Sequence, residues 1–417
     1  MSNDHAAKLP ATATPLATTA DVLGSPWYER LVIALARRAL GGPETGRLAL
    51  TLPSGTSAML AGGRQGHDAR LAIRDYGVLW HGLTRGKLAF AECYMDGRID
   101  IDDLGALFHF VLDNEAAMQR APGRMLRLRA PDRRYHASHA NTREGSRRNI
   151  AAHYDLGNAF YRLWLDRGMN YSSGIYAEPD DTLADAQAAK LARVIDALEL
   201  EPGHALLEIG CGWGSLLEAA AHRGATATGI TLSAEQLEWS LRRLSSAGLG
   251  ANATARFLDY RDTEGTYDRV ASIEMIEAVG EANWPTYFRV LAERLAPGGI
   301  GVIQAITIPE QFFDDYRRSP DFIQRYIFPG GMLPTIEAMQ RHAEANGLRF
   351  ETFERFGGSY ALTLRAWRER FHVAWPKISE LGFDERFRRM WDYYLAYCAA
   401  GFESGVIDVG LYRVHKA

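Results

Sequence analysis

The chain has 417 residues, which is enough for two domains at about 150 residues each. A net charge of −4 excludes a strong attraction of the whole protein to nucleic acid or anionic lipid, while 47% hydrophobic residues allow a large core. No apolar stretch approaches the roughly 20 residues that cross a bilayer, and the three scattered cysteines lack metal-type spacing, which favours a reduced, cytoplasmic protein without a metal site.

The first part of the chain predicts a leader and a small mixed domain. Residues 1–20 are rich in Ala, Thr and Pro and lack the pattern of a signal peptide, so we predict a disordered leader. Residues 21–118 are predicted to form a smaller N-terminal accessory domain that interacts with lipid. Helical spacing marks 27–40, and strand-like segments lie at 47–52 and 69–73.

A basic segment follows this domain. Residues 119–148 are predicted to be a linker that carries nine arginines, at positions 120, 124, 127, 129, 133, 134, 143, 147 and 148. One interpretation is a solvated linker, and the other is a patch that docks on anionic phospholipid head groups. Nucleic-acid binding is disfavoured because no aromatic platform accompanies the charges.

From residue 204 onward the chain alternates strands and helices. Strands are predicted at 204–209, 225–230, 252–258, 268–273 and 300–306. The intervening helices include 234–247 and 284–295, the second of which ends before a Pro-Gly-Gly stop signal. This alternation predicts a doubly wound α/β fold with a mostly parallel sheet, in which ligands bind at the carboxyl ends of the strands.

The segment ALLEIGCGWG (205–214) carries the clearest ligand signal. An apolar run ends at Glu208, and Gly210, Gly212 and Gly214 follow at alternate positions. Glycines allow the strand to turn sharply into a helix and let a ligand approach bare backbone amides at the helix N-terminus. The spacing G-x-G-x-G with an acid two residues upstream resembles that of S-adenosylmethionine-dependent methyltransferases.

The next two strand ends supply further candidates for that cofactor. Ser233 is a good N-cap with Gln236 completing a capping box, and Gln236 is also the candidate for the ribose hydroxyls. Thr231 stands where many methyltransferases have an acid. After the third strand, Asp259 offers a carboxylate to the adenine amino group, and Tyr260 offers a ring face.

The resemblance becomes specific when several segments are taken together. In order, these are HYDLGNAFYRLWLD, MNYSSGIY, GITLSAEQ, LDYRD, EMIEAVG, FIQRYIFPGGMLP, FGGSYALTLRAWRERF and YCAAGF, between residues 153 and 402. They resemble the cyclopropane fatty acid synthases and mycolic acid cyclopropane synthases. The resemblance implies a seven-stranded, Rossmann-like class I methyltransferase domain over residues 149–417.

The family implies a chemistry and a substrate. A cis double bond in an unsaturated acyl chain of a membrane phospholipid attacks the methyl of S-adenosylmethionine, and a base then removes a proton so that the cyclopropane ring closes. In this family the base is thought to be bound bicarbonate. By motif, its holders would be Glu277, Tyr360, the backbone near Ser173, Gln304 and Ile306.

The resemblance also assigns neighbouring residues. Tyr171 and Ser172 are expected to face the cofactor carboxylate, and Tyr154 the reacting carbons. Two positions depart from the common bacterial pattern: Ser173 stands where cysteine is usual, and Gln304 where histidine is usual. Glutamine still hydrogen-bonds an anion, and the plant-type synthases resemble this chain here.

Several alternatives stay open at this point. The same methyl transfer without ring closure would give methylene-branched chains or precursors of furan fatty acids. A non-catalytic lipid-binding protein and a small-molecule methyltransferase are the other candidates. The resemblance further implies association with the inner face of the membrane and a homodimer.

Overall fold

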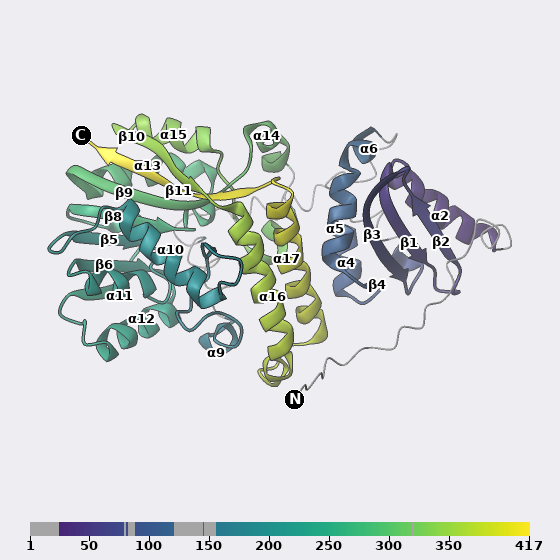
Figure 1. Cartoon of the computed structure of the whole chain (residues 1–417), viewed down its shortest axis with the longest axis horizontal. Coiled ribbons are helices and arrows are strands. Elements are labelled where there is room, and N and C mark those ends of the chain that lie inside the picture. Colours follow the sequence, from purple (N-terminus) through teal and green to yellow (C-terminus); the bar gives the residue numbers. More distant parts are fainter. Residues whose placement is uncertain (1–24, 79–80, 82–87, 121–144, 146–155, 319–320) are drawn as a thin grey trace. The chain divides into compact units, whose positions relative to one another are not determined.

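The computed structural model describes residues 25–78, 81, 88–120, 145, 156–318 and 321–417 (Figure 1). By their internal contacts the described residues form two compact units, one made of those within 25–81 and 96–120, and the other of those within 88–95 and 145–417. The predicted leader and most of the predicted basic linker lie outside the described residues. The predicted domain boundaries therefore stay predictions.

The first unit is built around a four-stranded sheet in the order β2-β1-β3-β4. Its strands are β1 (Thr45–Thr51), β2 (Ser57–Ala61), β3 (Arg64–Ile73) and β4 (Ile99–Ile101), and its helices are α2 (Trp27–Ala39), α5 (Leu104–Asp113) and α6 (Glu115–Arg120). The structure confirms the predicted helix and both predicted strands. It adds β2, antiparallel to β1, and β4, antiparallel to β3.

The second unit contains a seven-stranded sheet in the order β10-β11-β9-β8-β5-β6-β7. The strands are β5 (Ala205–Ile209), β6 (Thr226–Thr231), β7 (Ala253–Phe257), β8 (Tyr267–Ile273), β9 (Leu295–Thr307), β10 (Leu348–Arg355) and β11 (Asp408–Lys416). The five strands from β5 to β9 are parallel and correspond to the five predicted strands. β11 lies between β9 and β10 and is antiparallel to both.

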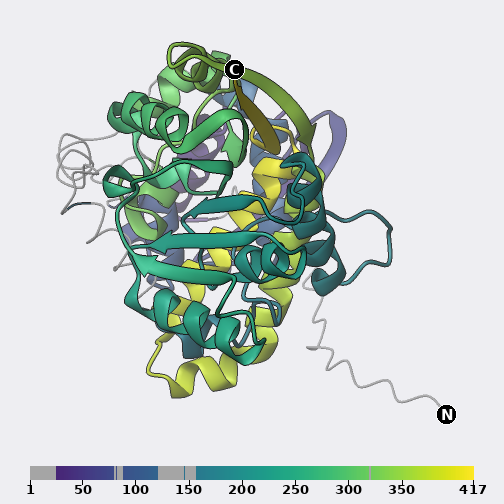
Figure 2. The ribbon, with the colours of Figure 1, turned by 90° about the vertical axis from the view of Figure 1, so that its left-hand side faces the viewer.

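Helices cover both faces of this sheet (Figures 1 and 2). α10 (Leu183–Ala197), α11 (Ser215–His222) and α12 (Ala234–Ser246) contact one another in one layer, and α13 (Trp284–Arg294) contacts α15 (Ile336–Glu344) in the other. The predicted stop signal after α13 lies within β9, where Gly298 has φ +75° and the pairing with β8 shifts register. The predicted α/β fold is thus confirmed.

The second unit contains further helices outside these two layers. They are α4 (Ala89–Met95), α9 (Asn158–Tyr161), α14 (Glu310–Arg318), α16 (Gly357–Glu380) and α17 (Glu385–Glu403). Figure 1 shows the long helices α16 and α17 side by side, and the two are in contact along their lengths. None of the described helices is both long and apolar enough to cross a membrane.

The main core lies between the sheet and the layer of α13 and α15. Val270 of β8 and Ile303 of β9 are fully buried there beneath Phe288 and Met339. Such strands, covered on both faces, read as continuous apolar runs, which is why the sequence identified them. The core holds the strand ends in place, and these ends carry the candidate site.

Candidate active site

The predicted glycine turn joins β5 to α11. Gly210, Gly212 and Gly214 have φ of +82°, +51° and +82°, which other residues rarely adopt. A β-carbon on Gly210 would lie 2.9 Å from the Cγ of Met275, whereas one on Gly212 would meet nothing within 4 Å. The backbone at Gly212 therefore stays open to a ligand.

A pocket opens over this turn, at the carboxyl ends of the central strands. Its wall includes eight of the predicted cofactor residues, namely Tyr171, Ser172, Glu208, Gly210, Gly212, Thr231, Gln236 and Tyr260. They come from β5 and the turn after it, from β6, α12, the segment after β7 and the loop before α10. The structure thus gathers residues that are up to 89 positions apart in the sequence.

The end of β6 differs in one detail from the prediction. Ser233 is the N-cap of α12, as expected, because its side chain accepts a hydrogen bond from the Gln236 amide at 3.3 Å. The Gln236 side chain does not complete a capping box. Its Oε1 instead accepts from the Thr231 hydroxyl at 2.8 Å, so its Nε2 stays available to an acceptor in the pocket.

The prediction for Asp259 is not supported by its position. Its carboxylate accepts from Nε and Nη2 of Arg261 at 2.8 and 2.6 Å, and it is not part of the pocket wall. Sequence reasoning overlooked that a cation two residues later can fold back onto this acid. Tyr260 does line the pocket, and the Arg261 guanidinium lies 5.4 Å from its ring centre.

A buried lysine that the sequence analysis missed stands beside this pocket. Lys190 is 2% exposed, and its Nζ donates to the Ser172 hydroxyl at 3.0 Å. Burial lowers the pKa of Lys190, and the carboxylates of Glu274, Asp166 and Glu208 oppose that change. Lys190 lies on α10 without a recognisable motif around it, so the sequence carried no signal for its burial.

Glu208 is a second buried ionisable group in the pocket wall. It is 3% exposed, and its Oε2 has no hydrogen-bond partner among the described residues. Burial raises the pKa of Glu208 to about 8, although the Lys190 cation acts in the opposite direction. An unpartnered buried carboxylate beside a pocket is expected to receive a donor from a ligand.

The residues predicted to hold an anion are split between two glutamates. Glu274, which follows β8, accepts hydrogen bonds from the Ser173 amide at 2.8 Å, from Gln304 Nε2 at 2.7 Å and from the Tyr360 hydroxyl at 2.6 Å. Sequence analysis assigned no role to Glu274. Its position as the first glutamate of EMIEAVG, directly at a strand end, was the available signal.

Glu277 has a different neighbour. Its Oε1 accepts from the Ile306 amide at 2.6 Å, and its buried Oε2 has no hydrogen-bond partner among the described residues. Burial and the charge of Glu274 raise the pKa of Glu277 to about 8. The predicted single cage around bicarbonate does not fit, because the donors of Ser173, Gln304 and Tyr360 already converge on the Glu274 carboxylate.

Aromatic rings connect the Glu274 environment to the pocket. The Tyr360 ring stacks on Phe402 at 4.5 Å and meets Trp367 edge-on at 6.1 Å. Trp367 in turn contacts Tyr171 at 5.3 Å, and the Tyr171 hydroxyl lies 3.1 Å from that of Tyr394. Ring faces attract positive charge, so this arrangement suits a reaction that passes through a cation. The predicted Tyr154 lies outside the described residues.

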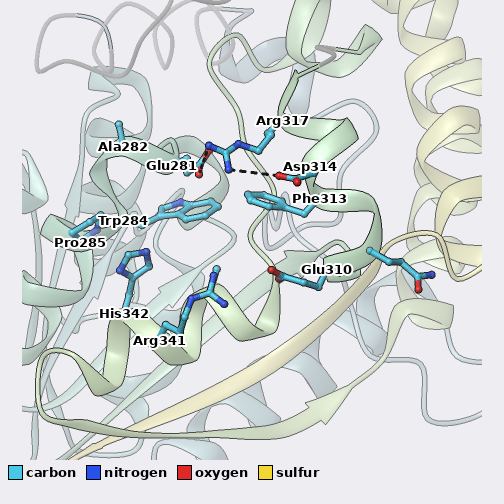
Figure 3. Close-up of a pocket in the computed structure, with 12 residues that line it drawn as sticks. Glu281, Ala282, Trp284, Pro285, Glu310, Phe313, Asp314, Arg317, Arg341 and His342 are labelled. Carbon is cyan, nitrogen blue, oxygen red and sulfur yellow. Dashed lines mark ion pairs between the residues drawn. The ribbon is translucent and has the colours of Figure 1, made fainter.

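A second pocket, of about 760 Å³, shares no residue with the first. Figure 3 shows its walls: the Trp284 and Phe313 rings lie 6.0 Å apart, and Arg317 lies 3.3 Å from Glu281 and 3.8 Å from Asp314. Arg317 is thus paired with two carboxylates, and the Glu310 carboxylate accepts from the Thr335 hydroxyl at 2.6 Å. Nothing there resembles the convergence of polar groups in the first pocket, which is therefore the candidate active site.

The sequence profile of the family described as mycolic acid cyclopropane synthetase matches residues 141–411. The chain belongs to this family. It is 44% identical over 277 residues to the tuberculostearic acid methyltransferase UfaA1 of Mycobacterium tuberculosis, an alignment that covers 64% of this chain and 65% of that relative, just under two thirds of its length. It is also 35% identical over 343 residues to the cyclopropane-fatty-acyl-phospholipid synthase of Escherichia coli, covering 80% and 83%.

Solved structures agree with this membership. The crystal structure of mycolic acid cyclopropane synthase CmaA1 complexed with SAH and CTAB has a TM-score of 0.60 and 30% identity, and covers 65% of this chain and 98% of that one. These matches confirm the predicted family and fold class. The family consists of S-adenosylmethionine-dependent methyltransferases, and the open glycine turn and unpartnered Glu208 of this member fit that cofactor.

Proposed function

We propose that this family member transfers a methyl group to the cis double bond of an unsaturated acyl chain in a membrane phospholipid and closes a cyclopropane ring. The observation that carries the proposal is the adjacency of two sites. Glu274 lines the cofactor pocket, and it also receives the hydrogen bonds of Ser173, Gln304 and Tyr360. A proton acceptor thus stands next to the place of methyl transfer.

In the proposed site, different residues of the pocket would contact different parts of the cofactor. When bound, S-adenosylmethionine supplies an electrophilic methyl group. The Gly212 backbone would lie against it, Gln236 Nε2 would donate to the ribose, and Tyr260 would lie beside the adenine. Tyr171 and Ser172 would face the methionine end, where the Lys190 cation would favour a carboxylate. These roles rest on the lining of the pocket and on the hydrogen bonds described above.

The acyl chain is proposed to react beside the aromatic rings. Attack by the double bond on the methyl group would break its bond to the sulfonium sulfur, release S-adenosylhomocysteine and leave a positive charge on the second alkene carbon. The Trp367 ring contacts the Tyr171 ring at 5.3 Å and the Tyr360 ring at 6.1 Å. The faces of these three rings favour that charge electrostatically. Loss of one proton from the new methyl group then lets its bonding electrons close the ring.

Methylene branching, in which the methyl group is transferred but no ring closes, is the second candidate. It is favoured by the 44% identity to a relative named as a tuberculostearic acid methyltransferase. In that outcome a hydride moves from the methylated carbon to the cationic carbon, and loss of a methyl proton leaves a methylene branch (C=CH2) on the open acyl chain. The two products contain the same atoms, so mass alone does not distinguish them.

The test is an assay with vesicles of mono-unsaturated phospholipid and S-adenosylmethionine, analysed by proton NMR. Upfield ring-methylene protons are the expected result, and vinylidene protons would support methylene branching. A Gly212→Val variant is the matched negative control, because a branched residue at φ +51° would also cover the open backbone. Absence of any lipid product, with cofactor binding intact, would refute the proposal and leave a lipid-binding protein.

We further infer peripheral association with the inner face of the membrane through the basic segment at 119–148. Its nine arginines oppose only two acidic residues. Binding to anionic vesicles should weaken with added salt, since the Debye length falls from about 10 Å at 0.1 M to about 3 Å at 1 M. Binding that ignores salt would contradict this. The homodimer stays a prediction, which light scattering tests.

A further inference from the structure

The environment of Glu274 has the composition of an anion-binding site. One backbone amide, one side-chain amide and one phenol point at the same two oxygens, from Ser173, Gln304 and Tyr360. Carboxylates that accept several such bonds are held firmly in position and favoured in the ionised form. These three donors belong to the set that the family resemblance had assigned to a bound bicarbonate. Here they are occupied by a side chain of the protein itself.

The backbone is shaped to place the Glu274 side chain there. Glu274 has φ +48°, a left-handed conformation that is uncommon for residues other than glycine, asparagine and aspartate. Its amide donates to the Gln304 carbonyl at 2.8 Å, which ties this turn to β9. Strained backbone of this kind persists where the surroundings determine it, and it gathers at functional sites.

The charges around Glu274 are also unusual. Burial raises the pKa of Glu274, and the hydrogen bonds from Tyr360, Ser173 and Gln304 together with the Lys190 cation act to lower it. Glu277 differs from Glu274, because its ionised form has a single hydrogen-bond donor, the Ile306 amide, among the described residues.

We propose that the Glu274 carboxylate replaces the bound anion and itself accepts the proton lost after methyl transfer, an inference that rests on the proposed function. One carbon–hydrogen bond of the transferred methyl group breaks, and its proton moves to a carboxylate oxygen of Glu274. The electron pair of that bond forms either the third side of the ring or, after the hydride shift, the double bond of the methylene branch. The acceptor is therefore the same for both products.

The first test measures dependence on bicarbonate. In carbonate-free buffer under nitrogen, the wild-type rate should stay within about twofold of the rate with added bicarbonate. Glu274→Gln keeps the shape but cannot accept the proton, so we expect a loss of at least about 100-fold, the usual contribution of a general base. Bicarbonate should not restore it. Glu264→Gln, at an exposed position, is the matched control and should retain the wild-type rate.

The second test removes the Glu274 carboxylate from its hydrogen-bond donors. Glu274→Ala removes the carboxylate and leaves the donors of Ser173, Gln304 and Tyr360 without it, so formate or bicarbonate should restore activity to this variant. The same anions should raise its melting temperature in the absence of cofactor and lipid. They should leave the melting temperature of the wild type and of Glu274→Gln unchanged, because a side chain fills the site in both.

These readouts separate the two proposals. A wild-type rate that falls more than tenfold without bicarbonate, or a Glu274→Gln variant that retains more than a tenth of the activity, would overturn the role of Glu274. Equal anion-dependent stabilisation of the wild type and Glu274→Ala would overturn it as well. Absence of lipid product in the wild type would instead refute the proposed function, while the melting measurements would still test how the anion site is filled.

Discussion

Cofactor binding should release a proton from Glu208. Burial raises the pKa of this carboxyl to about 8, and its Oε2 has no hydrogen-bond partner among the described residues. At pH 7 about 0.9 of the free protein molecules therefore carry the proton on Glu208. S-adenosylmethionine is cationic at its sulfonium and ammonium groups and brings hydrogen-bond donors into the pocket. Both favour the ionised carboxylate, so up to about 0.9 proton should leave for each cofactor bound.

Isothermal titration calorimetry at pH 7 in two buffers with different ionisation enthalpies measures this number directly. At pH 9 the release should fall to about 0.1, because Glu208 is then already ionised in the free protein. Glu208→Gln keeps the shape and should abolish the release. Glu277→Gln is the matched control, since Glu277 also has a pKa raised to about 8 but does not line the pocket. Release below about 0.2 proton in the wild type, or an undiminished release in Glu208→Gln, would refute this reasoning.

Three further predictions concern stability and the neighbouring residues. Gly229→Ala would bring a β-carbon within 2.6 Å of the Cys211 β-carbon and should lower the free energy of unfolding by about 1–3 kcal/mol in urea, whereas Gly358→Ala, with nothing within 4 Å, should not. Ser173→Ala should change the rate by less than about twofold, because Ser173 bonds Glu274 through its backbone amide; a tenfold loss would contradict this. Between pH 5 and 8 the folded protein keeps a proton on Glu277 that the unfolded chain has lost, so stability should fall as pH rises, by about 1.4 kcal/mol per pH unit for this group, and Glu277→Gln should flatten the slope seen in urea titrations.

Much of the fold could be predicted because its signals are local. The buried parallel strands read as apolar runs, and the N-cap Ser233 and the glycine turn need only a few neighbouring residues. The residues that form β10 and β11 were not predicted, although the family resemblance implied seven strands. β11 lies between strands that precede it by more than 50 residues, and its place in the sheet depends on pairing that no local pattern reveals.

The site was predictable to a similar extent. The family motifs brought the expected residues to the pocket wall, yet they assigned the anion to Glu277 and gave Glu274 no role. A left-handed backbone conformation at Glu274 determines which of the two glutamates contacts Tyr360. The local sequence EMIEAVG does not predict such a backbone angle. The pairing of Asp259 with Arg261 was not predicted for a related reason, because it depends on the 3₁₀ turn that follows β7.

The position of β11 has a consequence for how the second unit is made. During synthesis the five parallel strands leave the ribosome first, and β10 follows without a neighbour to pair with. Until residues 408–416 are free, the edge of β9 is open to pairing with another nascent chain. The sheet can therefore close only after translation has passed its final strand, and a chaperone that shields β9 during this interval would raise the yield of folded protein.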